Sequence, residues 1–253
     1  MNNNKVAFIT GAAKRIGKSI AVYLGKNRWN LVVQYNKSRN EIIKLEEELK
    51  DFKIDFYKFK YNFEKDFNYG DFYKKILSKS GKIDLLINNA SAFDFDTIKD
   101  SSNSIFDKHV NVNLKAPFFL SSYFAQNIGR RKGIIINILD QRVKNITPYF
   151  ASYTVSKVGL YALTRSMALN LAPRIRVNGI SPGPTLKSKN QTTEQFKKQC
   201  LKTPLSRQVE LDEINSAIEY IIKNESVTGQ VLTLDSGQSL GWANSKSKIF
   251  ATD

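Results

Sequence analysis

The sequence is poor in the residues that build disulfide frameworks and metal centres, with one cysteine, Cys200, and one histidine, His109, among 253 residues. A single thiol excludes an internal disulfide and a multi-thiolate cluster, and a single imidazole argues against a histidine-based metal site. We therefore expect no bound metal, and we assign neither residue a role.

Long apolar runs are missing as well. The longest dense run, residues 133–139, has the length of a buried strand rather than of a membrane span, and the N-terminal residues carry no signal-peptide pattern. With 42% apolar and 11% aromatic residues the composition is typical of a globular protein. These features predict a soluble, cytoplasmic protein with no membrane partner.

Acidic residues are few relative to basic ones, since 39 lysines and arginines stand against 23 aspartates and glutamates and give a net charge of +16. Such a balance favours anionic partners in general. The lysines are spread over the whole length, however, and form no basic arm of the kind that binds nucleic acids. We interpret the charge as a solvated lysine-rich surface and expect no nucleic-acid partner.

Strand-like and helix-like segments alternate along the whole chain. Short apolar runs predict strands at residues 6–9, 31–33, 54–59, 83–87, 133–139, 175–180 and 230–234. Helical spacing predicts helices at residues 16–24, 40–51, 71–79, 111–128, 152–171 and 211–222, the second with Ile42, Ile43, Leu45 and Leu49 facing inward. The alternation predicts the α/β class, with a single doubly wound parallel sheet of the Rossmann type and helices on both faces.

No linker rich in proline, glycine or serine divides the chain, so we expect residues 1–253 to form one domain. The one long irregular stretch, residues 181–205, carries Pro182, Pro184 and Pro204. A loop of this length in a compact domain is usually functional, which predicts a substrate lid at about residues 183–205.

Gly11 and Gly17 flank the turn between the first strand and the first helix, in the sequence Thr10-Gly-Ala-Ala-Lys-Arg-Ile-Gly17. Such a turn directs backbone N–H groups and the positive end of a helix dipole toward a ligand, which suits a pyrophosphate. The fingerprint Gly-x-Gly-x-x-Gly is absent, so an ordinary strand-to-helix turn is an equal alternative.

Tyr153 and Lys157 lie four residues apart on one face of the long helix predicted at residues 152–171. An ammonium near a phenol favours the phenolate and is expected to lower the pKa of the tyrosine. A phenol tuned in this way can exchange a proton with the atom beside a hydride acceptor. The spacing alone is common on solvated helices, so it needs support from other motifs.

Together these segments resemble the short-chain dehydrogenase/reductase family along essentially the whole chain. The motifs follow the family's order and spacing: Thr10-Gly11 with Gly17, Asn88-Asn89-Ala90, Asn113, Tyr153 with Lys157, Ser181-Pro-Gly-Pro184, Thr228-Gly-Gln230 and Leu234-Asp-Ser-Gly237. The resemblance implies a nicotinamide dinucleotide cofactor, which contacts Asn89, Ala90, Pro182 and Gly183 and whose nicotinamide ribose Lys157 holds. It also implies catalytic roles for Tyr153 and for Asn113, which would hold a proton-relay water. The alternative for Asn113 is a helical polar residue bound to local backbone.

Two positions depart from the usual family pattern. Arg15 replaces the middle glycine of the first turn, and Asp140 replaces the catalytic serine after the fifth strand. Both changes, together with Asn89-Ala-Ser91-Ala-Phe93, are similar to the pteridine reductases and the bacterial dihydromonapterin reductases. That resemblance implies that Ser91 contacts substrate and cofactor phosphate and that Phe93 stacks on a pterin ring. Core packing of Phe93 and a turn-capping role of Asp140 are the alternatives.

The reaction implied by this resemblance is hydride transfer from NADPH to a pterin-type substrate, a dihydropteridine such as dihydrobiopterin, dihydromonapterin or dihydrofolate. Tyr153 would deliver the proton, and Asp140 would assist protonation or order a water. A protonated ring nitrogen carries positive charge, which a carboxylate stabilises, and this favours an imine-like substrate over a ketone. The predicted substrate contacts are Ser91, Phe93, Asp140 and Tyr153.

The sequence also indicates whether the cofactor is NADPH or NADH. No acidic residue follows the second strand, where NAD-specific proteins bind the ribose hydroxyls. Arg15 and Lys37 can clamp a 2′-phosphate instead, with Asn36 and Ser38 as hydrogen-bond donors, and we therefore predict NADPH. A solvated Lys37 is the alternative. Ile16 and Asn62 complete the predicted cofactor contacts.

Two other functions remain open. A carbonyl reductase of the 3-oxoacyl-carrier-protein kind would suit the basic surface, but Asp140 argues against it. A non-catalytic binder of dinucleotides or nucleic acids would not need Asn113, Tyr153 and Lys157. The family resemblance further implies a homotetramer.

Overall fold

The structure is a computed structural model that describes residues 4–65, 68–189 and 191–240. Residues 1–3 and 241–253 of the predicted domain, and residue 190 of the predicted lid, lie outside the described residues. Within the described part of the chain no helix combines the length and the apolar character needed to cross a bilayer.

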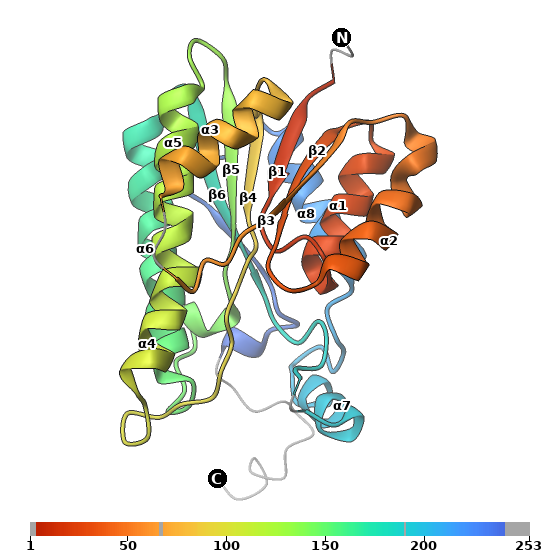
Figure 1. Ribbon diagram of the computed structural model, residues 1–253. Coiled ribbons are helices and arrows are strands. Elements are labelled where there is room, and N and C mark those ends of the chain that lie inside the picture. Colours follow the sequence, from red (N-terminus) through yellow and green to blue (C-terminus); the bar gives the residue numbers. More distant parts are fainter. Residues whose placement is uncertain (1–3, 66–67, 190, 241–253) are drawn as a thin grey trace, which may run out of the picture.

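Seven parallel strands form one sheet in the order β3-β2-β1-β4-β5-β6-β7 (Figure 1). The strands are β1 (Val6–Ile9), β2 (Asn30–Tyr35), β3 (Phe56–Lys60), β4 (Leu85–Asn88), β5 (Gly133–Ile138), β6 (Ile175–Pro182) and β7 (Val231–Leu234). Strands β1, β2 and β4 are buried at every residue, as expected for apolar runs covered on both faces. The predicted fold class is confirmed.

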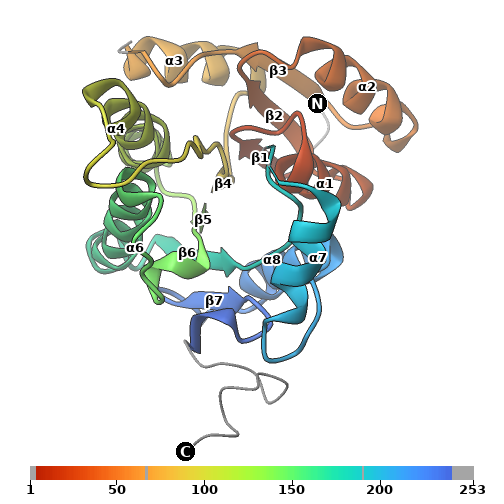
Figure 2. The same cartoon turned by 90° about the horizontal axis from the view of Figure 1, so that it is seen from below.

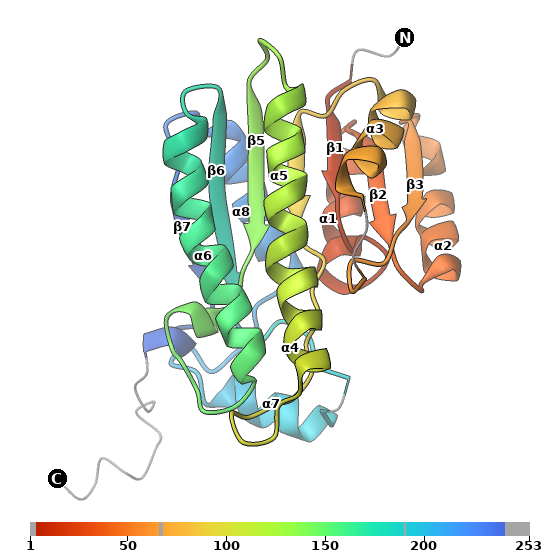
Figure 3. The same cartoon turned by 60° about the vertical axis from the view of Figure 1, so that its left-hand side comes forward.

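Helices cover both faces of the sheet (Figures 1 and 3). One face carries α1 (Arg15–Lys26), α2 (Arg39–Leu49) and α8 (Leu211–Lys223), and the other carries α3 (Tyr69–Ser80), α4 (Asn103–Val110), α5 (Ala116–Asn127) and α6 (Ala151–Leu171). A π-helical segment, Asn111–Lys115, joins α4 to α5. Each face has its own apolar core.

The strand order reverses between β1 and β4, because β2 and β3 extend the sheet on one side and β5 to β7 extend it on the other. The chain segments after β1 and β4 therefore leave in opposite directions and open a crevice at the carboxyl edge of the sheet. Figure 2 views the molecule toward this edge, with α7 (Thr193–Leu201) and α4 on opposite sides of the strand ends.

Three local predictions were wrong. The helix predicted from residue 111 begins at Asn103, where the Ser102 side chain caps the N–H of Ile105. The stretch predicted as irregular contains α7, which begins with a capping box between Thr192 and Gln195. Ile43 faces outward and is 46% exposed.

Candidate active site

A cavity of ≈ 1030 Å³ lies at the carboxyl edge of the sheet. Its wall comes from the turn after β1, the segment after β4, the 3₁₀ turn Gln141–Val143 after β5, α6, and the segment after β6 through α7. The predicted site residues on this wall are Gly11, Arg15, Ile16, Gly17, Asn36, Asn62, Asn89, Ala90, Ser91, Phe93, Asp140, Tyr153, Lys157, Pro182 and Gly183. Lys37, Ser38 and Asn113 are predicted site residues that do not line it.

The turn after β1 packs against the segment after β4. Gly11 adopts a φ of +63°, and a Cβ at Gly17 would lie 2.3 Å from the carbonyl oxygen of Gly11. The Asn89 amide donates to the carbonyls of Thr10 at 2.9 Å and Gly11 at 3.1 Å. Both glycines are therefore required by backbone conformation and close packing.

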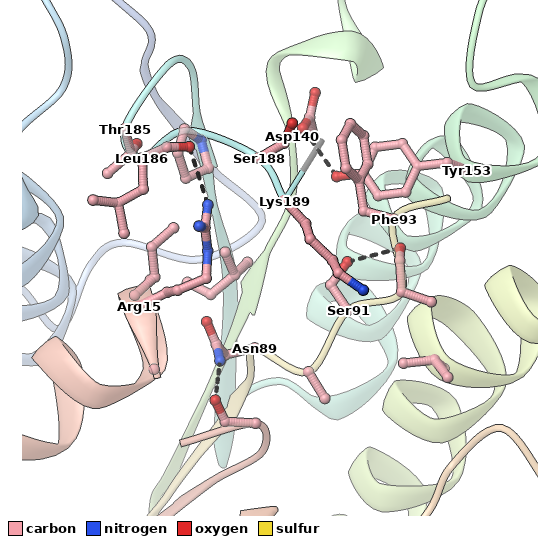
Figure 4. A pocket seen from close by; sticks show the side chains of 18 of the residues that line it. Arg15, Asn89, Ser91, Phe93, Asp140, Tyr153, Thr185, Leu186, Ser188 and Lys189 are labelled. Carbon is pink, nitrogen blue, oxygen red and sulfur yellow. Dashed lines mark hydrogen bonds between the residues drawn. The ribbon is translucent and has the colours of Figure 1, made fainter. Parts of the chain in front are cut away.

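Arg15 connects this turn to the predicted lid (Figure 4). Its guanidinium donates to the carbonyl of Lys187 at 2.7 Å and to that of Leu186 at 3.0 Å. The residue has a φ of 56°, an unusual conformation for a side chain of this size. The structure thus gives Arg15 two contacts in the lid that the sequence did not predict, and its contact with a phosphate stays a prediction.

The end of β2 brings only part of the predicted 2′-phosphate clamp to the cavity. Asn36 lies on the wall and donates to Asn62 at 3.0 Å, whereas Lys37 is exposed away from it. Lys37 is therefore placed as a solvated side chain, which was the alternative to a phosphate contact. Lys14, which the sequence did not single out, lies on the wall and pairs with Glu41 at 2.6 Å.

Asp140 and Tyr153 form the polar centre of the site (Figure 4). The Tyr153 hydroxyl donates to Oδ2 of Asp140 at 2.9 Å, while Oδ1 accepts from the backbone N–H of Arg142 at 2.9 Å and from its guanidinium at 3.3 Å. Each carboxylate oxygen therefore has a separate task. Asp140 caps the 3₁₀ turn, which was the alternative to a catalytic role. It also accepts the hydrogen bond of the Tyr153 phenol, and its part in protonation stays a prediction.

The pKa of Tyr153 shifts in the direction opposite to the prediction. Burial raises it well above 10, and the Asp140 carboxylate raises it further, while Arg142 and Ser91 act in the lowering direction. The prediction was wrong because it left out the burial of the phenol, which is the larger cause, and the Asp140 carboxylate that accepts its hydrogen bond. Tyr153 is therefore a neutral phenol, able to donate a proton.

Lys157 lies near the ring of Tyr153, and its ammonium hydrogen-bonds to a backbone carbonyl rather than to the phenol. Its ammonium donates to the Ile138 carbonyl at 2.8 Å and lies 5.8 Å from the centre of the Tyr153 ring. Burial lowers the pKa of Lys157 to about 8, against a raising effect of Asp140. The side chain is 2% exposed and reaches the cavity wall at its floor.

Asn113 acts on the segment after β4. Its fully buried amide accepts from the Ala92 N–H at 2.8 Å and donates to the Ala92 carbonyl and to the Ser156 hydroxyl, both at 3.0 Å. Asn113 does not line the cavity itself, but it fixes the backbone of residues that do. Its binding of a relay water stays a prediction.

Two stacked aromatic rings lie beside the Asp140–Tyr153 pair. Phe93 and Phe150 stack with centroids 4.4 Å apart and 8° between their planes, and the Tyr153 ring meets Phe93 edge-on at 4.7 Å. The Arg142 guanidinium lies 5.5 Å from the centre of Phe93 and 5.0 Å from that of Phe150. Sequence analysis missed Phe150 and Arg142, although Arg142 stands only two positions after Asp140.

A family model described as short chain dehydrogenase matches residues 5–198. The chain belongs to this family. The predicted family is therefore confirmed.

The chain is similar to proteins with different named activities. The 3-oxoacyl-[acyl-carrier-protein] reductase FabG of Staphylococcus epidermidis is 29% identical over 92% of this chain and 98% of its own length. An uncharacterized oxidoreductase of Thermotoga maritima is 30% identical over 93% of this chain and 97% of its own. Among solved structures, FolM alternative dihydrofolate reductase 1 of Brucella canis, complexed with NADP, is 37% identical with a TM-score of 0.89, over 96% of this chain and 97% of its own.

Proposed function

We propose that this short-chain oxidoreductase is an NADPH-dependent reductase of pterin-type substrates, dihydropteridines such as dihydrobiopterin, dihydromonapterin or dihydrofolate. The observation that carries the proposal is the Asp140–Tyr153 hydrogen bond at 2.9 Å beside the flat ring of Phe93. A carboxylate at this position suits a substrate that gains positive charge on a ring nitrogen. The 37% identity to a FolM dihydrofolate reductase supports the same substrate class.

The crevice has the properties that a dinucleotide requires. Helix α1 begins after Lys14 with no side chain capping its N-terminus, which leaves backbone N–H groups for a pyrophosphate. Asn36, Asn62, Ser91, Pro182 and Gly183 all line this same cavity. NADPH, the cofactor in the proposal, supplies a hydride when bound. NADP in the solved FolM structure supports this choice.

In the proposed reaction the chain's own residues position the substrate and move the proton. Phe93, which is 39% exposed and already stacked on Phe150, contacts the flat ring of the substrate with its exposed part, and Ser91 contacts the polar edge of that ring. Tyr153 holds a proton on its hydroxyl oxygen, because burial and Asp140 both raise its pKa, and gives that proton to the ring nitrogen. The carboxylate then faces the charge that protonation creates, and Arg142 keeps the carboxylate in place at 3.3 Å.

A second candidate is reduction of a 3-oxoacyl thioester. The FabG relatives favour it, since they match almost the whole chain at 29% identity. The carboxylate of Asp140 opposes it, because an alkoxide forming beside a carboxylate is repelled.

An NADPH-oxidation assay separates the two candidates. The purified protein is offered dihydrobiopterin, dihydromonapterin, dihydrofolate and an acetoacetyl thioester under identical conditions. We expect a higher kcat/KM for at least one of the three pterins than for the thioester. Turnover of the thioester alone would contradict the proposal.

We also propose that the protein is a cytoplasmic homotetramer. Helices α4, α5 and α6 expose apolar side chains that the described part of the chain leaves uncovered: Phe106, Phe118, Phe119, Val155 and Leu169. Such a surface is typical of a subunit contact. Light scattering at micromolar concentration is expected to give four times the chain mass, and a monomeric mass would contradict the proposal.

A further inference from the structure

His109 is a buried titratable residue that the proposed reaction does not use. Its side chain is 0% exposed, lies in α4, and meets the ring of Tyr153 edge-on with centroids 5.9 Å apart. It does not line the cavity. Nevertheless both ring nitrogens have partners, one in the segment after β4 and one at the start of α6.

The partners determine where the proton of the imidazole lies. Nε2 lies 3.0 Å from the backbone nitrogen of Asp94, which can only donate, so Nε2 accepts. The proton is then on Nδ1, which donates to the Ser152 hydroxyl at 2.7 Å. That hydroxyl in turn donates to Oδ2 of Asp96 at 2.5 Å. The hydrogen bonds run in one direction, from the Asp94 N–H through His109 and Ser152 to the Asp96 carboxylate.

Asp96 gathers further contacts at the end of this chain of hydrogen bonds. Its carboxylate accepts from the Ser152 N–H at 3.2 Å and from the Ser101 hydroxyl at 2.8 Å, and its backbone carbonyl accepts from the Phe150 N–H at 2.8 Å. Phe150 has a φ of 59°, a conformation that a bulky side chain keeps only when its surroundings hold it. Asp96 therefore fixes both the backbone of Phe150 and the residue before Tyr153.

The segment that carries Phe93 is held at several points. Thr10 Oγ1 accepts from the N–H groups of Asn89 and Ala90, both at 3.0 Å, and the Lys108 ammonium pairs with Asp94 at 2.8 Å. Residues 89–97 form neither helix nor strand, so their backbone is placed by side-chain contacts. Asn113 holds one end through Ala92, and the His109–Ser152–Asp96 network holds the other through Asp94 and Asp96. The same network ends one residue before Tyr153.

We infer that His109, Ser152 and Asp96 form a positioning network that fixes the Phe93–Phe150 rings relative to the Tyr153 hydroxyl. These are positioning residues, since none of them lines the cavity. The inference rests on the proposed function insofar as Phe93 supports the substrate ring. A small displacement of a reacting group lowers turnover. Cofactor binding is expected to stay the same, because the network does not contact the cofactor site.

The network requires a neutral imidazole, because a protonated ring would present N–H to N–H at Asp94. Burial lowers the pKa of His109, and Lys108 acts in the same direction, while the carboxylates of Asp94 and Asp96 oppose them. These are the charged groups that face the ring from its own helix and from the segment after β4.

The first test uses the fact that the chain has one histidine, so that in a tag-free protein the imidazole Nδ1 signal in nitrogen-15 NMR comes from His109 alone. We expect the Nδ1–H tautomer at neutral pH. Ser152→Ala should shift this signal, and Ser101→Ala should leave it unchanged, because Ser101 reaches Asp96 without touching His109. The Nε2–H tautomer, or a protonated ring at neutral pH, would overturn the inference. This measurement needs no substrate, so it stands even if the proposed function fails.

The second test is kinetic and compares the same two variants. With whichever substrate of the assay panel the wild-type protein reduces, we expect Ser152→Ala to lower kcat/KM roughly tenfold, the upper effect of one buried hydrogen bond. Ser101→Ala should retain the wild-type value, and both variants should bind NADPH as the wild type does. Equal kcat/KM for the two variants would overturn the inference, even if both melt at a lower temperature. Turnover of the thioester alone would refute the pterin proposal, while the comparison still tests the placement of Tyr153.

Discussion

Replacing Asp140 by asparagine separates the two tasks of its carboxylate. The asparagine oxygen can still accept from the Arg142 N–H, which Oδ1 now does at 2.9 Å. The amide nitrogen in place of Oδ2 can donate to the Tyr153 oxygen but cannot accept from its hydroxyl, so the phenol loses its 2.9 Å bond to a charged acceptor. Asp140→Asn should therefore keep the 3₁₀ turn and remove the charged partner of the phenol.

The expected loss in turnover follows from the bond that is removed. A hydrogen bond to a charged group contributes about 1.5–3 kcal/mol, and roughly 1.4 kcal/mol corresponds to a tenfold change in rate. With the loss of charge stabilisation at the ring nitrogen, kcat for dihydropterin should fall by about 10²-fold in Asp140→Asn and in Asp140→Ser. The pKa of Tyr153 should also fall, because the charge of Asp140 no longer raises it and burial alone remains. The decline of activity at alkaline pH should then begin at lower pH.

Steady-state kinetics with NADPH and a dihydropterin measure both effects. NADPH affinity, followed by fluorescence, serves as the control and should not change. Tyr153→Phe should abolish turnover. If Asp140→Asn keeps wild-type kcat while Tyr153→Phe is inactive, the carboxylate only caps the turn, and the assignment to pterins loses its main support.

Three further predictions concern the cofactor, the glycine turn and pH. NADPH should bind at least about tenfold more tightly than NADH, and Arg15→Ala should reduce this preference, since one charge-assisted bond contributes about 1.5–3 kcal/mol; equal affinities by calorimetry would contradict it. Gly17→Ala should lower the free energy of unfolding by about 1–3 kcal/mol and with it the melting temperature, because its Cβ would lie 2.3 Å from a carbonyl oxygen. A variant as stable as the wild type would show that the turn relaxes. The folded protein holds His109 with a lowered pKa, so the unfolded chain binds a proton first as pH falls below about 6.5. Stability should therefore decline below that pH, and His109→Gln should flatten the decline in urea titrations; an unchanged slope would refute it.

The seven strands and their order of appearance were predictable because each is a short apolar run between turns. Element ends followed local signals that apolar spacing does not show. Helix α4 begins at a Ser102 cap, and α7 begins at the Thr192–Gln195 capping box, a pattern present in the sequence but overlooked. Ile43 was placed inward although Ile42 and Leu45 already define the buried face of α2.

The site was predictable where a motif fixes a residue's place in the family, as for Gly11, Asn89, Asp140 and Tyr153. It was not predictable where contacts join distant segments. Phe150 reaches Phe93 across 57 positions of sequence, and Arg15 reaches Lys187 across 172. The pKa of Tyr153 was wrong for the same reason, since the spacing to Lys157 was visible but the bond to Asp140 was not.

The two hydrogen bonds from Arg15 to the predicted lid bear on how the range of substrates can change. Both acceptors are main-chain carbonyls, at Leu186 and Lys187, so the tie does not depend on which side chains those positions carry. The segment after β6, where we predict the lid, can therefore change its side chains and keep its hydrogen bonds to Arg15. In this architecture, selection or engineering can alter the residues of the lid one at a time without rebuilding its anchor.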